Sequence, residues 1–142
     1  MVLTTLAIVV LRYAFSQGAI VLQEGVLYLH GMVFMLGIPY ALKENAHVRV
    51  DLVYARLGAR GRAVVDLVGH VFGLLPVALA MLAYSYGYVA NSWRILEGSS
   101  EVGGIPGVFL LKTLIPLTAV LLTLQGIAEI GRCLETLRRV RG

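Results

Sequence analysis

Three histidines are the first residues of this 142-residue chain that could carry chemistry. Two imidazoles can share a haem only if they lie at matching heights on facing helices. His30 lies in the first half of one apolar stretch, His70 near the start of the next, and His47 in the polar segment between them. Because these heights disagree, the pattern favours ordinary hydrogen bonding between helices over haem ligation. Nor does any close spacing of histidine, cysteine and carboxylate predict a metal site.

The carboxylates could carry protons if one of them were buried in hydrocarbon, where its pKa would rise. A small four-helix exporter of cationic compounds would need such a group. Every acid of the chain lies at or beyond the boundary of an apolar stretch: Glu24, Glu44, Asp51, Asp66, Glu97, Glu101, Glu129 and Glu135. The chain also lacks a nucleophile elbow, a Gly-rich phosphate loop and a zinc motif. The sequence therefore predicts no catalytic, cofactor-binding or metal-binding residue, and no transport by this chain alone.

Four apolar stretches must position whatever polar groups the chain uses. Hydrophobic residues make up 58% of the sequence and charged residues 14%, against roughly 25% charged in ordinary soluble domains. A helix needs about 20 apolar residues to cross a bilayer, and the length suits four such helices. We therefore expect an all-α integral membrane protein, residues 1–142 forming a single domain. The expected spans are residues 1–15, 24–42, 63–93 and 108–132.

The first of these spans is shorter than the ~17 residues needed to cross. It has no basic leading region and no small-residue cleavage motif, so a removed signal peptide is the weaker interpretation. We interpret it as a transmembrane helix whose usual cytoplasmic lead-in is missing from this sequence.

Residues 48–62 are too polar to span, but their apolar side chains recur at spacings of three and four. The apolar set is Val50, Val53, Tyr54 and Leu57. This pattern predicts a short amphipathic helix, lying on the inner leaflet with its arginines toward lipid phosphates. A solvated loop without a fixed helix is the alternative.

The placement of the basic residues matters more than the net charge of +4, and it does not indicate a nucleic-acid partner. Nine of the twelve lie in the middle segment or near the C-terminus: Lys43, Arg49, Arg56, Arg60, Arg62, Arg132, Arg138, Arg139 and Arg141. By the positive-inside rule, the middle segment and both termini face the cytoplasm. Cys133 is the only cysteine, so an internal disulfide is excluded, and this orientation places it on the reducing side. Arg132 follows Glu129 within helical reach.

The middle segment also carries the residues that suggest a family. Residues 43–51 read Lys-Glu-Asn-Ala-His-Val-Arg-Val-Asp and precede the expected amphipathic helix. Shorter pieces follow in order: Leu11-Arg12-Tyr13, Gln23-Glu24, Ser92-Trp93 with Glu97, Gly104-Ile105-Pro106, Leu111-Lys112 and Leu124-Gln125-Gly126. Over nearly its whole length the chain resembles the small membrane subunit of TRAP (tripartite ATP-independent periplasmic) transporters. It departs from that family in its shorter N-terminus.

The resemblance implies a transport system of three parts in a bacterial inner membrane. A periplasmic solute-binding protein would capture an organic acid or a related solute, and a large permease subunit would move it with an ion gradient. The small subunit would be a scaffold that braces the large one and holds no cofactor, with sodium expected only at the large subunit. The alternative is a membrane anchor subunit of a redox enzyme complex, and a stand-alone exporter ranks third.

Several residues are then candidates for contact with partners or lipids. Arg49 and Asp51 could pair locally or contact the large subunit, while membrane-lipid headgroups are expected at Arg56, Arg60 and Arg62. The remaining partner candidates are Glu97, Glu101, Lys112 and Gly126. The two acids lie where the binding protein would dock, unless segment 97–107 is only a connection. Gly126 marks a close helix approach, either to the permease or within the chain's own packing.

Overall fold

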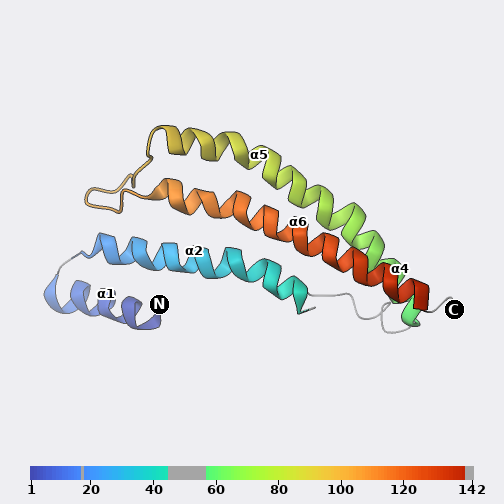
Figure 1. Cartoon of the computed structure of the whole chain (residues 1–142). Coiled ribbons are helices and arrows are strands. Elements are labelled where there is room, and N and C mark those ends of the chain that lie inside the picture. The colour runs from blue at the N-terminus through green and yellow to red at the C-terminus, as the bar shows by residue number, and fades with distance from the viewer. Residues whose placement is uncertain (17, 45–56, 140–142) are drawn as a thin grey trace.

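A computed structural model of the chain describes residues 1–16, 18–44 and 57–139. All regular structure in these ranges is helical: α1 (Val2–Phe15), α2 (Ile20–Lys43), α4 (Ala59–Val68), η1 (Gly69–Leu74), α5 (Leu75–Arg94) and α6 (Val108–Arg139). The elements α4, η1 and α5 follow one another without a break and form one rod of 36 residues. α6 packs between α2 and this rod, and α1 packs on α2 (Figure 1).

Three of the helical segments are long and apolar enough to cross a membrane: Ile20–Lys43, Ala59–Arg94 and Val108–Arg139. α1 is apolar as well but has only 14 residues, or about 21 Å of helix. The all-helical class is therefore confirmed. A crossing by α1, and with it the count of four spans, stays a prediction.

The third long helix begins at Ala59, four residues before the start expected for the third span. Arg60 and Arg62 consequently lie in the first turn of the rod rather than on a separate amphipathic helix. Arg49, Asp51 and Arg56, with most of the expected amphipathic segment, lie outside the described residues.

The buried positions of the described helices are mostly small or hydroxyl-bearing. They are Ala63, Ala78, Ser85, Val89, Ser92, Leu114, Thr118, Ala119 and Glu129, together with Pro39 and the helical glycine Gly126. Lipid tails are as apolar as leucine, so helices in a membrane associate by close packing and hydrogen bonds rather than by the hydrophobic effect. Small residues allow that close approach, which is why the larger apolar side chains of this chain point outward.

Prolines lie in all three long helical segments, at Pro39, Pro76 and Pro116, and the first two explain local features of the fold. Pro76 is the second residue of α5 and so closely follows η1, whose turns are widened to the π form. A proline ring would collide with the carbonyl four residues earlier in a regular helix, and widening the preceding turn relieves that contact. Pro39 lies inside α2 and leaves the carbonyl of Met35 without its helical donor, because proline has no N–H. The hydroxyl of Thr118 in α6 lies 3.2 Å from that carbonyl oxygen and donates to it.

Candidate functional site at the loop end of the helices

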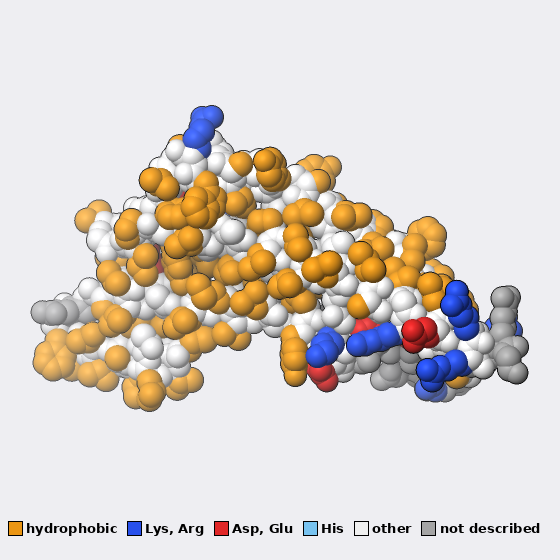
Figure 2. Space-filling model, in the orientation of Figure 1, with side chains coloured by type: hydrophobic (Ala, Val, Ile, Leu, Met, Phe, Trp, Pro, Cys, Tyr) orange, Lys and Arg blue, Asp and Glu red, His pale blue; other side chains and the backbone are white. Residues whose placement is uncertain are grey.

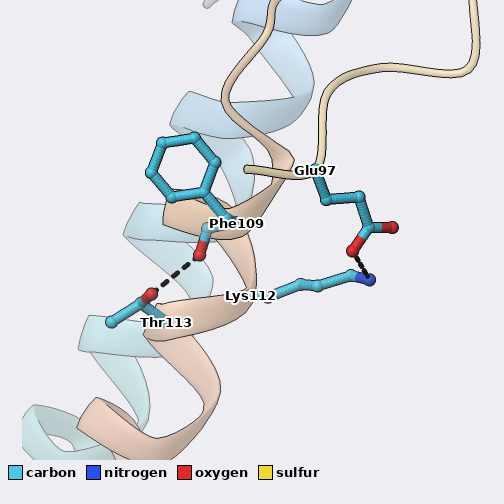
Figure 3. A network of polar contacts seen from close by, with 4 residues as sticks. All are labelled: Glu97, Phe109, Lys112 and Thr113. Atoms are coloured by element: carbon cyan, nitrogen blue, oxygen red, sulfur yellow. Dashed lines mark hydrogen bonds and ion pairs between the residues drawn. The ribbon is translucent and has the colours of Figure 1, made fainter. Parts of the chain in front are cut away.

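The loop end of the molecule comprises residues 95–107 and the helix ends beside them. Its main ion pair joins Lys112, at the start of α6, to Glu97, which follows α5; Nζ and Oε2 lie 2.5 Å apart (Figure 3). The Lys112 side chain is only 16% exposed, and its Nζ lies 4.1 Å from the centre of the Tyr88 ring. The hydrogen bond from Lys112 lowers the pKa of Glu97 below its usual value of 4.5. The pair therefore ties the end of α5 to the start of α6.

Aromatic and backbone contacts reinforce the same junction. The Trp93 indole N–H donates to the Thr113 hydroxyl at 2.8 Å. That hydroxyl donates to the Phe109 carbonyl at 2.7 Å (Figure 3). The Trp93 and Phe109 rings meet edge to face, with centres 4.7 Å apart, a favourable geometry for aromatic pairs. The Phe109 N–H also donates to the Glu97 carbonyl at 3.3 Å. Two helices that are sequential in the chain are thus held at a fixed spacing.

Glu24, in the second turn of α2, anchors the loop from the other side. Its carboxylate accepts hydrogen bonds from the Ser99 hydroxyl and from the Ile105 N–H. The loop also closes on itself, because the Ser99 N–H donates to the Ile105 carbonyl at 3.2 Å. The Glu24 carboxylate of α2 therefore holds both sides of the loop that joins the two other long helices.

Gly104 is required by that closure. A Cβ at this position would overlap the Ser99 side chain and the Glu24 carboxylate. Its neighbour Gly103 has φ +81°, a left-handed conformation that glycine adopts without the steric cost a side chain would add. The Gly-Gly pair thus lets the loop turn and lets α2 approach it.

The tip of the anchored loop is presented outward. Glu101 is exposed and Val102 is 92% exposed. Glu97, by contrast, forms an ion pair with Lys112 of the same chain. Of the two acids expected at a docking surface, Glu101 is the one whose position leaves it accessible to a partner.

The other candidates lie at separate places. Gly126 is buried against η1, where a Cβ would lie 2.8 Å from Cδ2 of Leu74. Its closest approach in this structure is therefore to the chain's own helix, while a role toward the permease stays a prediction. Arg60 and Arg62 lie at the opposite, basic end of the molecule, where α6 ends and α4 begins (Figure 1).

The histidines make local contacts on their own helices. His30 stacks on Phe34, and the Nδ1 of His70 lies 2.6 Å from the carbonyl oxygen of Asp66. His47 lies outside the described residues. The predicted contact of Arg132 with Glu129 is confirmed at 2.8 Å, and the Gln125 amide donates to the same Glu129 oxygen at 2.8 Å.

Sequence reasoning missed the anchoring role of Glu24 and the link from Thr118 to Met35. A signal for the second was present, since Pro39 inside an apolar stretch must orphan the carbonyl four residues before it. Nothing local indicated that Ser99 and Ile105 would meet Glu24.

A family model described as tripartite ATP-independent periplasmic transporters, DctQ component, matches residues 1–136. The chain belongs to the DctQ family. No curated protein and no solved structure matches it. The family assignment confirms the resemblance drawn from the middle segment and from the pieces around it. DctQ is a transporter component and not an enzyme, so the chain is the small subunit of a TRAP transporter and an integral membrane protein.

Membership of the DctQ family decides between the functional classes left open above. DctQ components work with a large permease subunit and a solute-binding protein. The loop end and the basic end are therefore best considered as surfaces of one subunit in a larger assembly. The interpretation as an anchor for a redox enzyme loses its support.

Proposed function

We propose that this DctQ chain is the static, bracing subunit of an uptake transporter for organic acids or related solutes in a bacterial inner membrane. Uptake depends on the solute-binding protein and is driven by an ion gradient, for which sodium is the expected ion. The solute and ion sites belong to the large permease subunit, and this chain binds no cofactor. Both termini face the cytoplasm, as the positive-inside rule predicts.

The observation that carries this proposal is where the carboxylates lie and what they contact. Residues 25–43, 67–96 and 102–128 contain no Asp or Glu, so the middle of each long helix has no acidic group to carry a proton or a cation. Glu129 is the buried carboxylate of the described helices, and Gln125 and Arg132 both donate to its Oε1. A chain built this way can hold a shape but has no central group with which to move a solute.

The exposed surface supports a bracing role. Large apolar side chains cover much of the face seen in Figure 2. Exposed examples on α2 and α5 are Val33, Phe34, Tyr40, Val77, Leu79, Tyr84 and Tyr86. Packing between the chain's own helices buries only a small part of their apolar surface. Most of that surface is therefore available to lipid and to the helices of a partner. The loop end, fixed by Glu24 and Lys112, keeps these helix faces at constant spacing.

Reconstitution tests the proposal directly. Vesicles containing the permease subunit, this chain and the binding protein should take up solute when an inward sodium gradient is applied. Vesicles containing this chain alone should take up none, and vesicles with the permease alone should take up much less than the complete set. Solute or sodium flux through this chain alone would overturn the static role. Full uptake by the permease without this chain would overturn the bracing role.

A further inference from the structure

A cavity of about 410 Å³ lies at the basic end, between the start of α4 and the end of α6. Its lining is Arg60, Val64, Leu134, Leu137 and Arg138. Each of the two helices thus contributes one guanidinium and at least one apolar side chain. The residues that line the cavity on the two helices are 70 or more positions apart in sequence, and Figure 1 shows these two helix ends side by side.

The two guanidiniums are available to an anion. In the described ranges neither Arg60 nor Arg138 has an acidic partner, whereas Arg132 on the same helix is paired with Glu129. Both arginines are exposed. A guanidinium presents a planar set of N–H donors that matches the oxygens of a phosphate, and two of them can hold one phosphate from both sides.

The rest of the lining is apolar and selects among anions. Val64, Leu134 and Leu137 would gain nothing from an inorganic phosphate, but they can cover the first methylenes of an acyl chain. An amphiphile with an anionic head therefore fits this cavity better than a soluble anion does. Figure 2 shows Lys and Arg side chains, with some Asp and Glu side chains among them, gathered at this end of the molecule beside the apolar surface of the helices.

We propose that this cavity binds one anionic phospholipid of the inner leaflet. Its phosphate lies between Arg60 and Arg138, and the upper part of an acyl chain lies against Val64, Leu134 and Leu137. The bound lipid bridges α4 and α6 and so fastens the long rod to the central helix at the end opposite Glu24. The inference rests on the proposed orientation, which places this end at the anionic cytoplasmic leaflet.

Native mass spectrometry of the purified full chain tests the proposal. Phosphatidylglycerol and phosphatidylcholine with identical acyl chains are titrated separately, and the first should be retained much more tightly. The double variant R60Q/R138Q should bind phosphatidylglycerol about fivefold more weakly for each arginine removed. The variant R94Q/R139Q loses the same charge without touching the cavity and should bind as the wild type does.

Adjacent single variants keep the test sharp if the double variant does not fold. Arg138→Gln should weaken phosphatidylglycerol binding, and Arg139→Gln, one residue further and outside the lining, should not. Equal losses in these two variants would show a diffuse basic surface and overturn the site. Equal retention of the two lipids by the wild type would overturn it as well.

A third set of measurements distinguishes binding of a lipid from binding of a free anion. The variant V64S/L134S should weaken phosphatidylglycerol binding, and inorganic phosphate should not displace the lipid. Displacement by phosphate, with no effect of V64S/L134S, would mean that the cavity holds an anion only, and would overturn the proposal. These measurements involve no permease and no uptake, so their failure is distinct from failure of the bracing function.

Discussion

The hydroxyl of Thr118 in α6 donates to the carbonyl of Met35 in α2, the oxygen that Pro39 leaves without a helical partner. Thr118 is fully buried, and its hydroxyl also lies 2.7 Å from the carbonyl of Leu114 on its own helix. In hydrocarbon no water can satisfy an orphaned carbonyl, so a neighbouring helix must do so. The proline and the threonine, 79 positions apart (118 − 39), therefore act as one structural unit.

We predict that Thr118→Val will lower the stability of the subunit by about 1 kcal/mol, the range measured for hydrogen bonds between membrane helices. Thr123→Val is the control, because that hydroxyl bonds only the Ala119 carbonyl of its own helix in the described structure. Unfolding in detergent, followed by circular dichroism, gives both values. In a Pro39→Ala background the new amide can serve Met35, so Thr118→Val should cost less there. An equal cost in both backgrounds would contradict the coupling of Thr118 to Pro39.

The ion pair of Glu97 with Lys112 predicts a pH dependence. The pKa of Glu97 is lowered by the hydrogen bond from Lys112, so the pair stabilises the folded chain fully above the usual value of 4.5. That stabilisation is lost as pH falls through the lower folded-state pKa. Glu97→Gln should therefore lower the unfolding temperature at pH 7, and the difference from wild type should shrink at pH 3. Glu101→Gln serves as the control and should lack this pH-dependent difference. A Glu97→Gln effect that stays constant across this range would rule out the ion pair as its cause.

Glycines in α6 should differ sharply in what they tolerate. Gly126→Leu must place its side chain against Leu74 and should destabilise the subunit by about 1–3 kcal/mol through overpacking. Gly131→Leu, on the same helix, faces open space and should leave the fold intact. The measurements are thermal unfolding and co-purification with the permease. If Gly126→Leu instead unfolds at the wild-type temperature but no longer co-purifies with the permease, this glycine lies at the permease interface.

Topology is testable with reporter fusions. A periplasm-active reporter should be silent when fused after Arg62 and active when fused near Ser100. The reason is that nine of the twelve basic residues lie in the middle segment or near the C-terminus, which should therefore face the cytoplasm. The reverse pattern would invert the orientation and remove the basis for placing the solute-binding protein at the loop end.

Docking of the binding protein should depend on Glu101. Glu101→Lys should slow uptake at limiting binding protein, because complementary charges act mainly on the association rate. The defect should shrink as salt rises, since the screening length is about 8 Å at physiological ionic strength. Glu135→Lys makes the same charge change at the basic end and should not slow uptake. Wild-type uptake by Glu101→Lys at low salt would show that the loop is only a connection.

Hydropathy and charge placement in the sequence determined the helical class, the three long helices and the contrast between a basic end and a loop end. These properties are local: apolar runs of sufficient length become helices, and Arg132 reaches Glu129 because they are three residues apart. Helix ends were less predictable. The rod begins at Ala59 rather than Ala63 because Arg60 and Arg62 can occupy a first helical turn as readily as a polar segment.

The tertiary structure alone decided which distant residues meet. Glu24 contacts Ser99 and Ile105 across 75 and 81 positions, and Thr118 contacts Met35 across 83. The sequence placed Glu97 and Lys112 on the same side of the membrane but did not predict that they form an ion pair. It gave no indication of a cavity between Arg60 and Arg138. The physical reason is that an apolar helix in lipid has no strongly preferred face. Small residues, orphaned carbonyls and helix-end charges set its rotation only once its neighbours are in place.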